Sequence, residues 1–358
     1  MLAVSFFCMD DLSLGEVQYR NDLHHISMNI LIFEYITGGG LIGQPLPSTL
    51  AREGDMMLFA AVNDFRALPG CNVFILRDHR LSNSVLGART VVVGPGESYD
   101  DKLEAFAGTV DSMLIIAPEN GDILFSLCER YSTQSFELLN TEPRTIRLTS
   151  HKFATYRYLL AHEIPQIPTC RAADIRSLRG DRFVMKPEDG VGCTDISLLE
   201  SRSELQAAAD GADREHFIFQ PYVQGVHASL SMLCWEGAGL VLSCNRQQIR
   251  EEGGSLQWEG CTVGALENEK FAGFADQIAR ALPGLRGYVG VDAVVAKNEI
   301  LLVEINPRLT TSYVGLGTAL GTNPAQWIMQ CFAERALPAV TPPCRVPVEV
   351  DLEGGQLA

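Results

Sequence analysis

The chain has 358 residues, of which 46% are hydrophobic, enough to bury a large core divided among two or three packed subdomains. Its formal net charge of −16 argues against a nucleic-acid-binding protein, because binding to the phosphate backbone depends on clustered Lys and Arg. No stretch approaches 18 uninterrupted apolar residues, and the first residues carry acid where a signal peptide carries base. We therefore expect a cytoplasmic protein without a membrane span.

The N-terminal third alternates apolar runs with helical patterns. Residues 1–27 lack a clear period and are interpreted as an extension that need not be native, with Met28 as an alternative start. From 28 to 145, buried strands are expected at 29–35, 72–76, 90–94 and 112–119, and helices near 48–66 and 101–109. This alternation predicts an α/β domain built on a doubly wound parallel sheet.

The remaining chain divides into three further pieces. Residues 146–223 form a smaller lobe with strands at 182–187 and 216–223, and residues 224–335 form a strand-rich lobe with one helix near 268–281. The Pro-rich residues 336–358 are expected to form a loose tail.

A glycine run follows the first strand and satisfies the dinucleotide fingerprint G-x-G-x-x-G between Gly38 and Gly43. The fingerprint requires its glycines to open a helix whose N-terminal amides receive a pyrophosphate. Pro45 and Pro47 intervene, and the helix is expected to begin near Ser48. A turn that lets a substrate approach the backbone, or a purely structural turn, is favoured over a dehydrogenase site.

A predicted hairpin at residues 287–308 brings two carboxylates together. If its turn is centred on Asn298, residues whose numbers sum to 596 pair, and Asp292 then lies opposite Glu304. Like charges that face each other directly on a sheet are destabilising, so a cation is expected between them. Asn306 lies on the same face as Glu304 and adds a third oxygen.

Two carboxylates and an amide oxygen are the oxygen-only environment that Mg²⁺ prefers, so Asp292, Glu304 and Asn306 are candidate metal ligands, with Mn²⁺ as an alternative ion. The alternative reading is a surface hairpin whose acids face solvent. Arg308 projects to the same face, where it would contact a transferring phosphoryl group or simply neutralise the acids.

Phosphate-binding residues are expected near the strand that ends at Lys186. Gly190 and Gly192 follow this strand and would let backbone amides close on phosphate oxygens, while Lys186 supplies a point charge. Lys152 begins a helical segment from which its ammonium group could reach the same phosphates. Gln220, in the strand 216–223, could bind an adenine edge. Taken alone, Lys186 and its glycines are more often a solvated lysine and an ordinary turn than a nucleotide site, and Lys152 is as often a surface lysine.

Taken in order, the segments HKFATYRYLL, FVMKPEDGVGCTDI, FIFQPYVQGVHASLSM and GYVGVDAVVAKNEILLVEINPR resemble the ATP-grasp superfamily over residues 146–320. The resemblance implies a nucleotide held between two α+β lobes, preceded by the substrate domain. It implies ATP and Mg²⁺ as cofactors and an acyl-phosphate route that joins a small-molecule acid to an amine; a homodimer is left open.

Carried over residue by residue, the resemblance gives Lys152 and Lys186 to the phosphates and Arg308 to the transferred phosphoryl group. Asp292, Glu304 and Asn306 would bind the metal, and Gln220, Tyr222 and Val223 would line the adenine. His227 stands where the family usually has an acid for the ribose hydroxyls, and a neutral imidazole can still accept one hydrogen bond there.

Over most of the chain after Met28, the segments ILIFEYITGGGL, LPSTLAREGDMM, LRDHR, IIAPE and NPRLTTSYVGL are similar to tyramine–glutamate ligases of methanofuran-type cofactor synthesis. That similarity implies glutamate and an arylethylamine as substrates. Candidate substrate contacts are Gly39, Gly40, Arg246, Thr311, Ser312 and Tyr313. Two alternatives stay open: another ATP-grasp amino-acid or peptide ligase, and a regulatory protein that binds ATP without turnover.

Overall fold

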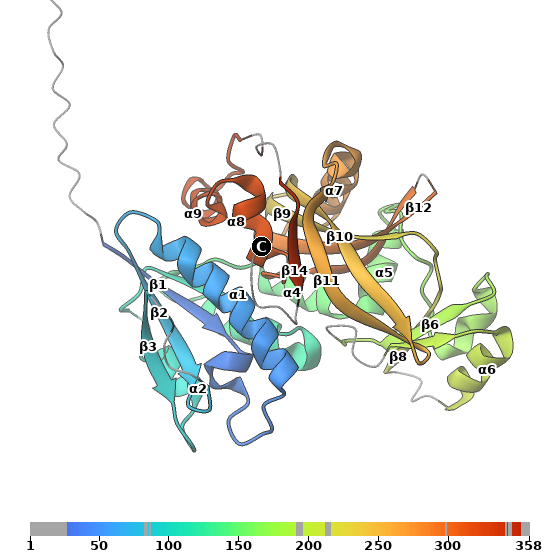
Figure 1. Cartoon of the computed structure of the whole chain (residues 1–358), viewed down its shortest axis with the longest axis horizontal. Coiled ribbons are helices and arrows are strands. Elements are labelled where there is room, and N and C mark those ends of the chain that lie inside the picture. The colour runs from blue at the N-terminus through green and yellow to red at the C-terminus, as the bar shows by residue number, and fades with distance from the viewer. Residues whose placement is uncertain are drawn as a thin grey trace, which may run out of the picture.

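The computed structural model describes residues 27–81, 85, 87–106, 108–190, 196–211, 216–297, 299–340, 342 and 346–351. The predicted extension, except for Ser27, lies outside these residues, as does Gly192. In Figure 1 the N-terminal sheet lies at one end of the molecule, the lobe with β6 and β8 lies at the other, and long antiparallel strands lie between them.

The N-terminal sheet is entirely parallel, as predicted, with strand order β3-β2-β1-β4-β5. Its strands are β1 (Met28–Glu34), β2 (Cys71–Asp78), β3 (Ala88–Val93), β4 (Ser112–Ile116) and β5 (Glu137–Leu138), and its helices are α1 (Ser48–Arg66), α2 (Tyr99–Glu104) and α3 (Ile123–Tyr131). The chain adds β2 and β3 on one side of β1 and then places β4 and β5 on the other, so the winding of the sheet changes direction between β1 and β4. Open parallel sheets bind ligands beyond the carboxyl ends of their strands at such a point.

The glycine run forms a short π-helical turn, η1 (Ile36–Gly40), rather than the start of an α-helix. Gly39 has a φ of 100°, and a Cβ at this position would lie 2.8 Å from Cβ of Val93. Helix α1 begins only at Ser48, after Pro47. The predicted helix start is confirmed, and the helix N-terminus that a dinucleotide site needs does not follow the glycines.

The second sheet has the order β13-β12-β9-β10-β11-β7-β6-β8, with β14 also paired to β11. Its strands are β6 (Phe183–Pro187), β7 (Ser197–Leu199), β8 (Phe217–Pro221), β9 (Val226–Trp235), β10 (Ala238–Glu252), β11 (Ser255–Leu266), β12 (Gly287–Ala296), β13 (Glu299–Asn306) and β14 (Val348–Asp351). The small lobe joins the long strands through the pair Ser255 and Ser197.

The helices around this sheet correct two expectations. They are α4 (Pro143–Ser150), α5 (Lys152–Leu160), α6 (Arg202–Gly211), α7 (Glu269–Ala281), α8 (Tyr313–Leu320) and α9 (Pro324–Glu334), with the 3₁₀ turns η2 (Asn120–Asp122) and η3 (Ala172–Ser177). One helix was expected between 224 and 335, but α8 and α9 follow α7. The tail is not loose throughout, because Val348 and Val350 are buried where β14 pairs with β11.

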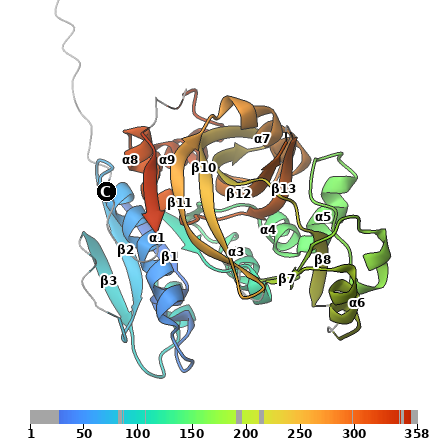
Figure 2. The same ribbon diagram turned by 45° about the vertical axis from the view of Figure 1, so that its right-hand side comes forward.

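Helix α1 holds the two halves of the molecule together. It lies between the N-terminal sheet and the strands β11 and β14 in both views (Figures 1 and 2), and it packs against α8 and α9. Leu58 and Phe65 belong to the same buried cluster as Leu316 and Ile328. None of the helices in the described part of the chain is long and apolar enough to cross a membrane.

Candidate functional site

A cavity of about 250 Å³ opens between the small lobe, the long strands and the hairpin β12–β13. Among the predicted site residues, the ones that line it are Lys152, Lys186, Gly190, Gln220, Tyr222, Val223, His227, Asp292, Glu304, Asn306, Arg308, Thr311 and Ser312. These residues are separated by up to 160 positions in the chain, and the fold brings them to one cavity.

Four of the candidate substrate residues lie away from this cavity. Gly39 and Gly40 pack inside η1 against Val93 and Tyr35. Tyr313 is fully buried in the core. Arg246 is exposed, whereas its neighbour Gln247 lines the cavity. On this strand, the residue that faces the cavity is therefore the one after the predicted residue.

The hairpin places Asp292 opposite Glu304, as predicted, through a register that differs from the expected one. Ala296 pairs with Glu299, which is one residue off the assumed register, and the offset persists as far as Ala293 and Leu302. The register shifts between Ala293 and Asp292 because Val303 is an extra residue on β13. A bulge of this kind re-aims the side chains that follow it, and Val303 and Glu304 consequently both line the cavity.

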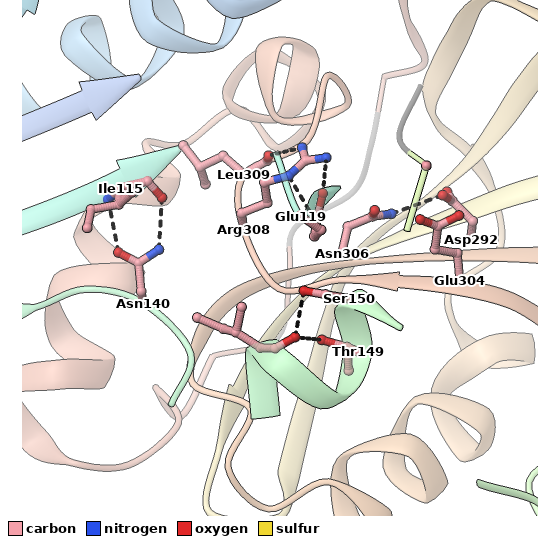
Figure 3. Close-up of polar contacts among 12 residues, drawn as sticks. Ile115, Glu119, Asn140, Thr149, Ser150, Asp292, Glu304, Asn306, Arg308 and Leu309 are labelled. Carbon is pink, nitrogen blue, oxygen red and sulfur yellow. Dashed lines mark hydrogen bonds and ion pairs between the residues drawn. The ribbon is translucent and has the colours of Figure 1, made fainter. Parts of the chain in front are cut away.

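Asp292 lies between two amide groups. Nε2 of Gln247 donates to Oδ1 at 2.7 Å, and Nδ2 of Asn306 donates to Oδ2 at 3.0 Å; Figure 3 shows the second contact. Burial and the neighbouring charge of Glu304 raise the pKa of Asp292 to about 6, although both hydrogen bonds and Lys186 act in the opposite direction. The site therefore destabilises its own negative charge, and a cation would relieve this cost.

Lysine side chains complete the polar wall. Nζ of Lys152 lies 3.3 Å from Oε1 of Glu304 and also donates to the carbonyl oxygen of Gly190. Lys186 is 5% exposed and comes from β6 of the small lobe. Two opposed carboxylates and one amide oxygen, with cations on the phosphate side, fit the donor set that Mg²⁺ prefers. The sequence-derived ligand set is thus chemically consistent with a divalent ion.

The opposite wall of the cavity belongs to β8 and the following turn. Nε2 of Gln220 donates to Oγ1 of Thr169 at 2.7 Å, which fixes the amide plane. The guanidinium group of Arg182 lies over the ring of Tyr222, 4.5 Å from its centroid. Burial lowers the pKa of His227, so its imidazole is neutral at physiological pH and can accept a hydrogen bond from a hydroxyl group.

Two acids from the N-terminal domain lie close to Arg308, and neither was among the candidates. Glu119 follows β4 and binds Arg308 at two points, Oε2 to Nη2 at 2.9 Å and Oε1 to Nε at 2.9 Å (Figure 3). The amide of Asn140 exchanges two hydrogen bonds with the backbone of Ile115, which holds the end of β4 in place. Glu53, on α1, lines the cavity. The strand expected at 112–119 included Glu119, but β4 ends at Ile116, so Glu119 lies just beyond the carboxyl end of a parallel strand, where ligand-binding residues gather.

Comparisons with known proteins match this arrangement. The family model described as an ATP-grasp domain matches residues 149–312, and the model described as the pre-ATP-grasp 3 domain matches residues 71–146. The chain belongs to the ATP-grasp superfamily. The hairpin carboxylates, both lysines and Arg308 all lie within the residues matched by the ATP-grasp model.

Curated relatives identify the type of reaction. The chain is 27% identical to the tyramine–L-glutamate ligase of Methanocaldococcus fervens over 81% of this chain and 89% of the relative. It is 25% identical to the tyramine–L-glutamate ligase of Methanocaldococcus jannaschii, over 81% and 85%. This ATP-grasp protein is a carboxylate–amine ligase that forms a carbon–nitrogen bond.

Solved structures share the fold. An ATP-grasp superfamily protein from Archaeoglobus fulgidus superposes with a TM-score of 0.67 at 24% identity, covering 91% of this chain and 100% of that one. N5-carboxyaminoimidazole ribonucleotide synthetase in complex with ADP superposes with a TM-score of 0.65 at 18% identity, over 90% and 81%. The two ATP-grasp lobes and the preceding parallel domain are therefore those of this fold.

Proposed function

We propose that this ligase couples ATP hydrolysis to joining a glutamate carboxylate with an arylethylamine such as tyramine, through an acyl phosphate. The observation that carries the proposal is the identity of 27% with a tyramine–L-glutamate ligase across 81% of the chain. The cavity supports it, because one continuous space holds cations for phosphates, an apolar wall and a carboxylate from the N-terminal domain.

In this mechanism each wall of the cavity has a separate task. Lys152 and Lys186 hold the phosphates of ATP, while Gln220, Tyr222, Val223 and His227 hold the nucleoside. Asp292, Glu304 and Asn306 would hold Mg²⁺, which supplies charge neutralisation to the phosphates when bound. Arg308 offsets the negative charge that develops as the substrate carboxylate attacks the γ-phosphate in line.

The cavity also has to protect the acyl phosphate from hydrolysis until the amine attacks it. The amine attacks the acyl carbon while the bound substrates fill the cavity and exclude water that would otherwise hydrolyse the acyl phosphate. Trp258, Ile249 and Leu256 line the cavity from β10 and β11 and would pack against the aryl ring of the amine. Catalysis of this type depends on positioning and electrostatics, and it needs no nucleophilic side chain.

The test is a substrate panel with ADP release as the signal. Glutamate with Mg-ATP and hydroxylamine should yield a hydroxamate, and glutamate with tyramine should yield one amide product, identified by mass spectrometry. Aspartate and glutamine serve as acid controls, and phenethylamine and histamine as amine controls. ADP release that depends on a different acid or amine would replace the proposed substrates with that pair.

A further inference from the structure

The charges around Arg308 do not balance. Its guanidinium group is held at two points by Glu119, which is 4% exposed. Glu53 lies close enough for its carboxylate to be attracted electrostatically by Arg308 and repelled by Glu119. One cation and two carboxylates therefore share this end of the cavity, which leaves one negative charge uncompensated.

Glu53 is the carboxylate that remains available. Among the described residues it makes no hydrogen bond and no ion pair, and it lines the cavity from α1. Asp55, the next acid on the same helix, is committed to the buried guanidinium group of Arg77. A half-buried carboxylate that faces a cavity without a partner is costly unless a ligand supplies one.

The fold gives this carboxylate a specific position. Arg308 lies two residues after Asn306, the last residue of β13, and Thr310, Thr311 and Ser312 continue the same cavity wall. Glu53 reaches this wall from helix α1, which lies on the opposite side of the long strands β10 and β11 from β8 (Figures 1 and 2). An ammonium group bound to Glu53 would therefore stand beside the transferred phosphoryl group rather than beside the adenine.

We propose that Glu53 binds the ammonium group of the amine substrate and accepts its proton before attack. This inference rests on the proposed function and names the residue that activates the amine. An alkylammonium ion has a pKa close to that of lysine, about 10.4, so the amine arrives protonated and cannot attack. Burial raises the pKa of Glu53, an effect that Arg308 opposes and Glu119 enhances, which makes its carboxylate a stronger base.

The ammonium nitrogen gives one proton to the Glu53 carboxylate, and its freed lone pair forms the carbon–nitrogen bond at the acyl carbon. The bond between that carbon and the phosphate oxygen breaks, and phosphate leaves with the electron pair. The second proton on the nitrogen goes to the departing phosphate, and Glu53 returns its own proton to solvent.

Comparing hydroxylamine with tyramine as the nucleophile distinguishes proton transfer to Glu53 from the earlier formation of the acyl phosphate. Hydroxylamine is uncharged at neutral pH and needs no base, whereas tyramine does. In Glu53→Gln, hydroxamate formation from glutamate should stay within about threefold of the wild type, while amide formation with tyramine should fall at least about 100-fold, the range of general-base catalysis. The amide rate of this variant should rise with pH as free amine accumulates. Glu53→Asp should recover part of the rate.

The matched control is Glu104→Gln, which removes an exposed acid from helix α2 of the same domain and should leave both rates unchanged. Equal losses with hydroxylamine and tyramine, or no loss with either, would overturn the role of Glu53. Failure of the wild type to form any hydroxamate would instead remove the proposed function.

A binding measurement decides the matter independently of turnover. Calorimetric titration of tyramine into the wild-type chain with Mg-ADP at neutral pH should show binding that Glu53→Gln weakens at least about tenfold and Glu104→Gln does not. Equal affinities, or no tyramine binding by the wild type, would overturn the inference.

Discussion

The substitution Asp292→Asn should stabilise the metal-free protein while abolishing its activity. Burial and Glu304 raise the pKa of Asp292 from 3.8 to about 6. At about 1.36 kcal/mol per pKa unit, the ionised carboxylate costs the folded state about 3 kcal/mol at neutral pH. An asparagine side chain can still accept a hydrogen bond from Gln247, but its own amide nitrogen faces the donor Nδ2 of Asn306. The lost hydrogen bond offsets about 1 kcal/mol of this gain. The net gain is about 2 kcal/mol.

The sign of the pH dependence follows from the raised pKa. The unfolded chain loses the proton of Asp292 near pH 4, but the folded chain keeps it until about pH 6. The metal-free wild type is therefore most stable with respect to this group below pH 4, and it loses that contribution as the pH rises through 6. In EDTA, the variant should lack this part of the decline.

Scanning calorimetry in EDTA at pH 7.5 should show the midpoint of Asp292→Asn about 3 °C above that of the wild type. Mg²⁺ with a nucleotide should raise the wild-type midpoint by more than that of the variant, because the variant lacks one of the three proposed metal ligands. Asp64→Asn is the matched control, since burial also raises the pKa of Asp64 to about 6 but Asp64 lies outside the cavity. A midpoint of Asp292→Asn below the wild type in EDTA would refute the reasoning.

Three further substitutions test neighbouring features. Gln247→Leu removes one of two amide donors from the metal-site carboxylate and should weaken Mg²⁺ activation about tenfold in a titration of ADP release, whereas Gln248→Leu should not. Gly290→Ala places a Cβ 2.5 Å from Cγ2 of Thr310 and should cost about 1–3 kcal/mol in urea unfolding. Burial raises the pKa of Glu34 from 4.5 to about 7, so Glu34→Gln should remove a loss of about 3 kcal/mol that the wild type shows as the pH rises through 7.

Local patterns in the sequence were sufficient to predict most of the elements that build the site. The run at 29–35 and the helix from Ser48 were recognised because their apolar residues follow the period of a strand and of a helix. Helix α8 was missed because its sequence YVGLGTAL has no polar face. Strand β14 was missed because its four residues show their alternation only when β11 is present beside them.

The two acids at Arg308 could not be predicted from local patterns at all. Glu119 stands 189 positions before Arg308, and Glu53 lies on a helix where it reads as an ordinary surface acid. Their meeting depends on how the parallel domain docks against the hairpin, which is decided by the packing of α1 on α8 and α9. Tertiary packing, rather than periodicity, therefore determines which acids lie beside Arg308.

The hairpin shows why a correct pairing does not guarantee a correct register. If β13 kept its regular alternation past Leu302, Val303 would face the cavity and Glu304 and Asn306 would face the opposite side. The bulge at Val303 reverses this phase, and Leu302 and Ile305 fill the core while Glu304 and Asn306 face the cavity. The turn assumed from the sequence was one residue too long, which shifted the predicted register by one. The unpaired Val303 shifts the actual register back by one, so Asp292 and Glu304 pair as predicted. The bulged pairing thus decides whether this sequence presents a carboxylate pair.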